Sequence, residues 1–155
     1  MSWHAAPHVV YTQRMSRSLP FLYAAEELGD ALSERLAPIF AAAELTATQF
    51  NVLYMLIEDG PMKMSALAEQ QRCVKSNVSY LARTMERDGL VELKASAEDQ
   101  RARLIAATAL GRQRYVVAKR GAQKLEIALK KALGADAVQQ LARACLEAAK
   151  AIGES

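Results

Sequence analysis

Apolar positions recur at three- and four-residue steps along most of this chain, which is the period of amphipathic helices. The first periodic stretch starts near Leu19 or Pro20 and reaches about residue 43, whereas residues 1–17 show no clear period. Pro38 lies inside the stretch and removes one backbone donor, so a kink or a break into two helices is expected there. The pattern predicts an irregular arm followed by a long helix.

A capping signal marks the start of the next helix. Thr46 and Gln49 have the spacing at which a hydroxyl and a side-chain amide each accept a hydrogen bond from the other residue's backbone N–H group. This spacing predicts a helix over Ala47–Glu58, and Gly60 and Pro61 are expected to end it.

Two further helices are predicted on either side of a tight turn. Ser65 is placed to cap a short helix that runs to Gln71, and a turn at residues 72–74 leads to a helix over Lys75–Arg87. The inward side of the second of these helices should carry Val78, Leu81, Ala82 and Met85. Its opposite side and flanks are polar, basic and aromatic, with Ser76, Asn77, Ser79, Tyr80, Arg83 and Arg87.

A hairpin follows this helix-turn-helix. Asp88 and Gly89 should end the helix, residues 90–94 form a short strand, and Arg103–Ala107 its antiparallel partner. The connection at 95–102 carries Asp99 and Arg101 near its tip. The order of elements predicts a mostly α fold, a winged helix-turn-helix.

Two more helices complete the pattern. Thr108 is placed to cap a long helix that ends at Gly134, and a last helix runs over about 136–152. A module of about 65 residues cannot bury the apolar stripes of all the flanking helices. We therefore expect a homodimer with three regions: residues 1–44 and 111–155 for dimerisation, and 45–110 as the winged helix-turn-helix domain.

Composition narrows the class of protein. The chain has 155 residues, and 52% hydrophobic with 6% aromatic residues favours packed helices in one unit. It contains no run of eighteen apolar residues and no signal-peptide pattern, so a cytoplasmic protein without a membrane partner is expected.

Catalytic and metal-binding patterns do not emerge from the sequence. Cys73 and Cys145 form no CxxC pair, and His4 and His8 have no further ligands nearby, so we predict no metal and no cofactor. Without a nucleophile elbow, paired bases or a glycine-rich phosphate loop, we do not expect an enzyme.

Charge is segregated along the chain. The net charge is +3, but residues 63–120 hold twelve basic and six acidic residues, a balance of +6. The remainder has eight basic and eleven acidic residues, a balance of −3. A positive helix-turn-helix segment fits a polyanion such as double-stranded DNA.

Side-chain chemistry assigns roles to the candidate DNA contacts. Ser76, Asn77, Ser79, Tyr80 and Arg83 suit phosphates and base edges, whereas Lys75, Arg87, Lys94 and Arg103 suit phosphates alone. The competing interpretation is an ordinary solvated helix face, whose basic residues only make the electrostatic potential of the surface more positive and contact no DNA.

Four segments resemble the MarR family of winged-helix regulators. They are LTATQFNVL at 45–53, GPMKMSALAEQ at 60–70, SNVSYLARTMERDGLVE at 76–92 and EDQRARLIAATALGR at 98–112. The resemblance implies that Asp99 holds the hairpin and Arg101 enters the minor groove, that Lys75–Arg87 is the recognition helix, and that the terminal helices of two subunits form the dimer. Half-sites would then lie roughly 34 Å apart.

The resemblance also implies a ligand-responsive repressor with a small aromatic or anionic effector. The candidate effector residues are Tyr11, Arg14, Arg17, Tyr23, Tyr54 and Tyr115, with packing in the dimer interface as the alternative. Arg72 and Val74 stand where the family often has glycine and aspartate, so a protein-interaction module without DNA binding is a second hypothesis. A third is a redox-responsive regulator that acts through Cys73.

Overall fold

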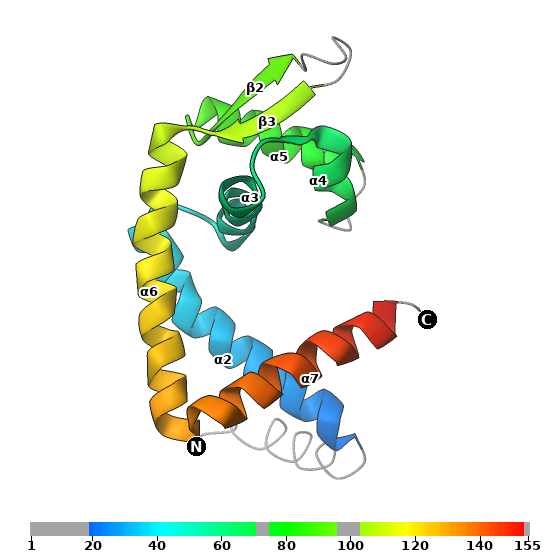
Figure 1. Cartoon of the computed structure of the whole chain (residues 1–155), viewed down its shortest axis with the longest axis vertical. Helices are drawn as coiled ribbons and strands as arrows, with labels where there is room; N and C mark the ends of the chain where they lie inside the picture. Colours follow the sequence, from blue (N-terminus) through cyan, green and yellow to red (C-terminus); the bar gives the residue numbers. More distant parts are fainter. Residues whose placement is uncertain (1–18, 71–74, 96–102, 154–155) are drawn as a thin grey trace, which may run out of the picture. The chain divides into compact units, whose positions relative to one another are not determined.

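The computed structural model describes residues 19–70, 75–95 and 103–153 (Figure 1). Its elements are α2 (Pro20–Ala42), α3 (Ala47–Glu58), β1 (Met62–Lys63), α4 (Met64–Gln70), α5 (Lys75–Arg87), β2 (Val91–Ala95), β3 (Arg103–Ala107), α6 (Ala109–Leu133) and α7 (Ala135–Gly153). This order confirms the predicted mostly α winged helix-turn-helix. The chain divides into two compact units, Met1–Pro38 and Ile39–Ser155, and the winged helix lies in the second.

Helix α2 begins at Pro20, as predicted, and continues through Pro38. The alternative of a break into two helices at Pro38 is wrong, because one missing donor leaves the rest of the hydrogen-bond ladder in place. The helix ends in a Schellman turn, in which the N–H groups of Glu44 and Leu45 donate to carbonyls of the last turn. Glu44 there has a φ of 52°, a left-handed conformation usually taken by glycine.

The core of the second unit surrounds α3. Its largest fully buried side chains come from α3, α4, α5, β2, β3 and the turn before β2, and they are Val52, Leu53, Leu56, Leu67, Met85, Leu90, Val91 and Ile105. On α5 the predicted inward positions Val78, Ala82 and Met85 are buried, whereas Leu81 is half-buried at the margin of that face. The helical period therefore located the core side of α5.

The sheet has three antiparallel strands in the order β1-β3-β2. Strand β3 has the predicted bounds and pairs with β2 from Val91↔Ala107 to Ala95↔Arg103. Strand β1 was not predicted, because two residues are too short to show an alternating pattern.

Helix α4 starts directly after β1, at Met64. Ser65 therefore lies inside the first turn, and its predicted role as the cap is wrong. The chain enters α4 from a paired strand, so strand pairing fixes the start of this helix in place of a side-chain cap.

Helices α6 and α7 follow the prediction closely. The Thr108 hydroxyl oxygen caps α6 by accepting from the Gly111 N–H, and Gly134 ends the helix with a φ of 89°. On α7, Val138 is buried, but the apolar side chains of Leu141, Cys145 and Ile152, at three-, four- and seven-residue steps, are exposed. Within the described residues no single helix is long and apolar enough to cross a membrane, although α2 and α3 pass that test jointly as a bent pair.

Candidate nucleic-acid interface

Helix α5 presents an exposed face opposite its buried side. Asn77, Ser79, Arg83 and Arg87 are exposed, and the side chain of Tyr80 is 76% exposed. An aromatic side chain with this exposure contributes little to the core, so packing does not explain its presence. The side chains of Lys75 and Ser76 lie outside the described residues.

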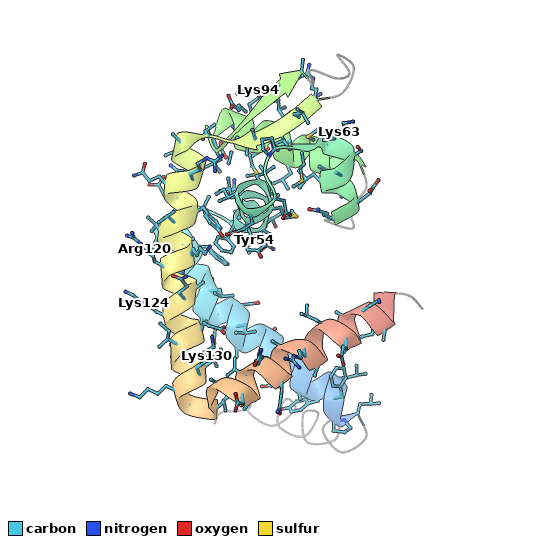
Figure 2. All side chains as sticks on the ribbon, in the orientation of Figure 1. Tyr54, Lys63, Lys94, Arg120, Lys124 and Lys130 are labelled. Atoms are coloured by element: carbon cyan, nitrogen blue, oxygen red, sulfur yellow. The ribbon has the colours of Figure 1, made fainter. Side chains whose placement is uncertain are left out.

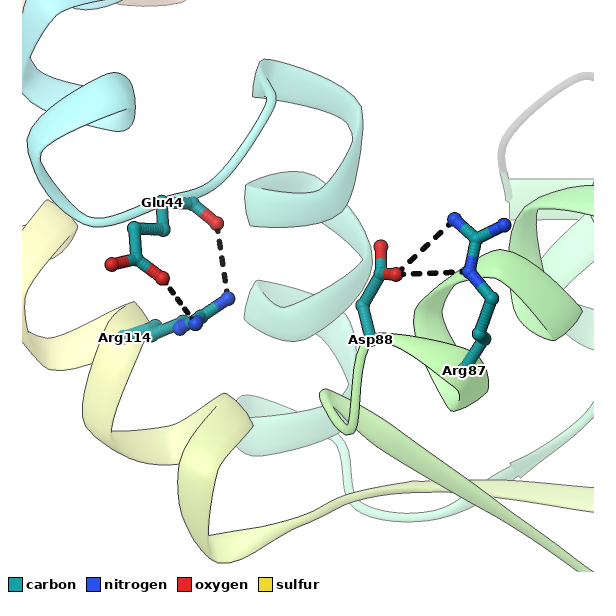
Figure 3. A network of polar contacts seen from close by, with 4 residues as sticks. All are labelled: Glu44, Arg87, Asp88 and Arg114. Carbon is teal, nitrogen blue, oxygen red and sulfur yellow. Dashed lines mark hydrogen bonds and ion pairs between the residues drawn. The ribbon is translucent and has the colours of Figure 1, made fainter.

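The predicted cations of this region differ in their partners. Arg87 Nε and Nη2 each lie 3.2 Å from an Asp88 carboxylate oxygen (Figure 3), and Lys94 Nζ lies 2.6 Å from Glu92. No carboxylate of the described residues forms an ion pair with Arg83. Of the basic side chains described on α5, Arg83 is therefore the more available to an anion.

The sheet supplies further exposed cations. Arg103 is exposed at the start of β3, opposite Ala95, and β1 pairs with β3 so that Lys63 lies opposite Leu104. Lys63 is also exposed, and Figure 2 labels it. Lys63 was not among the predicted site residues, because β1 itself was missed. Asp99 and Arg101 lie outside the described residues, but the Ala95↔Arg103 pair shows that β2 and β3 bring both ends of their loop together.

The end of α5 is fixed by backbone hydrogen bonds. Gly89 has a φ of 73°, and the N–H groups of Gly89 and Leu90 donate to the carbonyls of Glu86 and Met85 at 3.0 and 2.8 Å. The Glu86 carboxylate also accepts from the Leu93 N–H at 3.3 Å. These bonds orient α5 relative to the strand that carries the wing.

The candidate effector residues that the structure describes lie on three different helices. Tyr23 is half-buried on α2 in the first unit, Tyr54 is half exposed on α3 in the second, and Tyr115 is buried on α6. Tyr11, Arg14 and Arg17 lie outside the described residues, as does Cys73. Among the residues that the structure describes, no cluster of metal-ligating side chains is found.

Tyr115 belongs to a polar and aromatic cluster between α3 and α6. Its ring stacks on Phe50 at 5.3 Å between centroids, and its hydroxyl donates to Glu58 at 3.1 Å. Lys119 Nζ donates to the same carboxylate oxygen at 2.8 Å and lies 5.3 Å from the centre of the Tyr115 ring. Sequence reasoning missed Glu58 and Lys119, and only the four-residue spacing of Tyr115 and Lys119 was visible in advance.

The cluster shifts the titration of its members. Hydrogen bonds from Lys119 and Tyr115, with the charge of Lys119, lower the pKa of Glu58. The hydrogen bond to Glu58 raises the pKa of Lys119, and burial raises the pKa of Tyr115. Glu58 is therefore ionised and Lys119 protonated at neutral pH.

A second polar contact joins α6 to the turn before α3. The Arg114 guanidinium donates to the Glu44 carbonyl oxygen at 3.3 Å and forms an ion pair with the Glu44 carboxylate (Figure 3). Together with the Glu58 cluster, this pair attaches the N-terminal half of α6 to α3 and its preceding turn.

Comparison with known proteins agrees with this geometry. Residues 45–102, which contain α3, β1, α4, α5 and β2, match the profile of the MarR family. This segment of the chain is therefore similar to the MarR-family domain. No curated protein sequence matches the chain.

Solved structures share the fold of this segment and of the helices that flank it. A mutant MarR from E. coli, complexed with operator DNA, is 19% identical with a TM-score of 0.75 over 86% of this chain and 96% of its own. NadR in complex with 4-hydroxyphenylacetate is 23% identical with a TM-score of 0.70 over 97% and 96%. The regulator MOSR of M. tuberculosis, in complex with DNA, is 25% identical with a TM-score of 0.65 over 85% and 97%. Family and fold together support a transcription regulator.

Proposed function

We propose that this protein is a homodimeric repressor that binds a pseudo-palindromic operator and responds to a small aromatic or anionic effector. The observation that carries the proposal is the exposed face of α5, where Tyr80 is 76% exposed and Arg83 is unpaired within the described residues. A helix with one buried and one polar, basic face fits the major groove of DNA.

The proposed contacts divide by chemistry. Ser76, Asn77, Ser79, Tyr80 and Arg83 contact base edges and phosphates, and Lys75, Arg87, Lys94 and Arg103 contact phosphates. Because Arg87 and Lys94 already pair with Asp88 and Glu92, each gains less from a phosphate than an unpaired cation does. Asp99 holds the loop of the hairpin, and Arg101 enters the minor groove.

Exposed apolar side chains support the homodimer. Large aliphatic residues on the C-terminal half of α6 and on α7 are 44–72% exposed, namely Ile127, Leu133, Leu141, Leu146 and Ile152. Covering such a surface releases water from apolar groups, which favours association. We propose that residues 111–155, with residues 1–44, form the subunit interface and that 45–110 bind DNA.

The effector proposal rests on the family and on one neighbour. NadR was solved with 4-hydroxyphenylacetate, an aromatic carboxylate. Tyr23, Tyr54 and Tyr115, with Tyr11, Arg14 and Arg17 outside the described residues, supply aromatic and cationic groups of matching chemistry. A regulator of this kind acts in the cytoplasm and performs no catalysis.

Fluorescence anisotropy tests the DNA proposal. Binding to a duplex from the upstream region of the protein's own gene is compared with binding to a scrambled duplex across a salt series. Arg83→Ala should weaken specific binding by about 1–3 kcal/mol, and Arg101→Ala should weaken it and reduce the salt slope. Arg120→Ala removes an exposed cation from α6, outside the proposed DNA contacts, and serves as the matched control (Figure 2). Because Arg120 lies within the proposed subunit interface, size-exclusion chromatography first checks that the variant is a dimer, and its Kd should then be unchanged within about twofold.

Three outcomes would contradict parts of this proposal. Equal and weak binding to both duplexes would show that the upstream region contains no operator for this protein. No binding at low salt favours the protein-interaction module. An Arg120→Ala variant that loses as much affinity as Arg83→Ala shows that only the overall positive charge matters, and that α5 does not read the DNA.

A further inference from the structure

Thr108 joins the ends of three elements. Its N–H donates to the Leu90 carbonyl at 3.1 Å, and its hydroxyl lies 2.6 Å from the Gly89 carbonyl oxygen. The hydroxyl oxygen accepts from the Gly111 N–H at 3.0 Å. One side chain thus connects the turn that ends α5 and begins β2 with the first turn of α6.

The first turn of α6 also lies directly against the main chain after α5. A Cβ atom built on Gly111 would stand 2.1 Å from the Leu90 carbonyl oxygen. Contacts between backbone atoms cannot relax by a change of rotamer, as side-chain contacts do. We call Gly89, Leu90, Thr108 and Gly111 the Thr108 junction.

The two sides of the junction are rigid in themselves. On one side, the Schellman turn at Gly89 and the Glu86–Leu93 hydrogen bond fix the end of α5. On the other, the N-cap hydrogen bond fixes the first turn of α6. The angle between α5 and α6 is set by β2–β3 pairing, by the core around α3, and by the bonds that Thr108 makes directly across the junction.

We infer that Thr108 is a positioning residue for operator recognition, which holds α5 and α6 at one angle and so sets the separation of the two α5 helices in the dimer. The inference rests on the proposed function. Helix α6 has 25 residues and runs from the junction to α7, and the proposed subunit interface includes its C-terminal half. At 1.5 Å per residue it is about 37 Å long, so a change of about 5° at the junction displaces its far end by about 3 Å. That displacement is close to the rise of one DNA base pair, about 3.4 Å.

Two substitutions and a matched control isolate this role. Thr108→Val keeps the shape of the side chain and removes the hydroxyl, whereas Thr108→Ser keeps the hydroxyl. Thr46→Val is the control, because the Thr46 hydroxyl also caps a helix by accepting from a backbone N–H, at 3.1 Å, and this hydrogen bond stays within the capping box of α3. Thr46→Val and Thr108→Val should lower stability alike, which thermal unfolding checks.

The decisive measurement is Kd against a series of operators in which one or two base pairs are inserted or deleted between the half-sites. Wild type, Thr108→Ser and Thr46→Val should bind one spacing best and lose affinity on either side. Thr108→Val should give a flattened profile. If the Thr108→Val protein has the wild-type angle between α5 and α6 about one tenth of the time, its apparent Kd for the best spacing rises about tenfold. A Thr108→Val profile as sharp as that of wild type overturns the inference and leaves operator binding intact.

A second measurement needs no DNA. Residual dipolar couplings of amides in α5 and α6 report whether the two helices keep a single relative orientation in the free protein. Wild type, Thr108→Ser and Thr46→Val should fit one alignment tensor for both helices, and Thr108→Val should not. If the wild-type protein binds no operator, the proposed function is refuted, and the dipolar couplings still test the junction separately. A single tensor for Thr108→Val overturns the rigid junction.

Discussion

Replacing Gly111 with alanine tests how closely α6 approaches the main chain after α5. The new Cβ atom would lie 2.1 Å from the Leu90 carbonyl oxygen and 3.0 Å from Leu53 Cδ2. Close carbon–oxygen contacts in proteins are about 3.3 Å, so the two segments must separate by about 1.2 Å. Because the nearest obstacle is backbone, α6 or the turn at Leu90 has to move as a whole.

The cost follows from three effects. Overpacking of a filled site destabilises by about 1–3 kcal/mol. Separation also weakens the hydrogen bond from Thr108 N–H to the Leu90 carbonyl, about 1 kcal/mol. Alanine returns up to about 1 kcal/mol, because it favours the helix over glycine. The expected loss is about 2 kcal/mol, or about 4–8 °C in Tm for a chain of this length.

Thermal unfolding followed by far-UV circular dichroism measures this loss at one fixed protein concentration, because subunit pairing would make Tm depend on concentration. Gly29→Ala is the control: Gly29 lies within α2, and its added Cβ would meet nothing within 4 Å. That variant should be stabilised by about 0.5–1 kcal/mol. A Gly111→Ala protein as stable as wild type, or stabilised like the control, would refute the close approach.

Three further predictions concern contacts made by α6. Gly121→Ala places a Cβ 2.4 Å from Ile39 Cγ2, so it should lower the free energy of unfolding by about 1–2 kcal/mol. In an Ile39→Ala background the same substitution should cost nothing, and losses in urea unfolding that simply add in the double variant would contradict the contact. The lowered pKa of Glu58 contributes stability above the ordinary value of 4.5, and this stability is lost as pH falls through the lowered pKa. Glu58→Gln should therefore make Tm fall less steeply below pH 4.5, and a fall as steep as that of wild type would exclude the ion pair with Lys119. Tyr115→Phe keeps the aromatic stack and should cost about 1 kcal/mol, whereas Tyr115→Ala should cost about 3–5 kcal/mol; equal losses would mean that the ring contributes nothing.

Local signals were predicted well from the sequence. The capping box of Thr46 and Gln49 is present with both hydrogen bonds, at 3.1 and 2.8 Å. Its groups lie within three residues, so their meeting requires only that the helix forms. The polar face of α5 was likewise predicted, because 100° per residue fixes which positions share a side. What that face binds stays a prediction.

Errors arose where a neighbouring element replaced a local signal. Ser65 has the chemistry of a cap and would start a helix at residue 66, but α4 begins two residues earlier, at Met64, directly after β1 pairs with β3. Pro38 removes one donor, yet α2 runs through it without a break. In both places the rest of the fold outweighs a preference of one residue.

The sequence by itself determined the order of the helices and the hairpin, the buried side of α5 and most helix ends, because period and capping act within one or two helical turns. Only the tertiary structure decided the contacts that couple them. The Tyr115 hydroxyl meets a carboxylate 57 residues away at Glu58, and the Thr108 hydroxyl meets the Gly89 carbonyl 19 residues away. Such bonds depend on the approach of whole helices and strands, which is set by packing of the common core and leaves no fixed spacing along the chain.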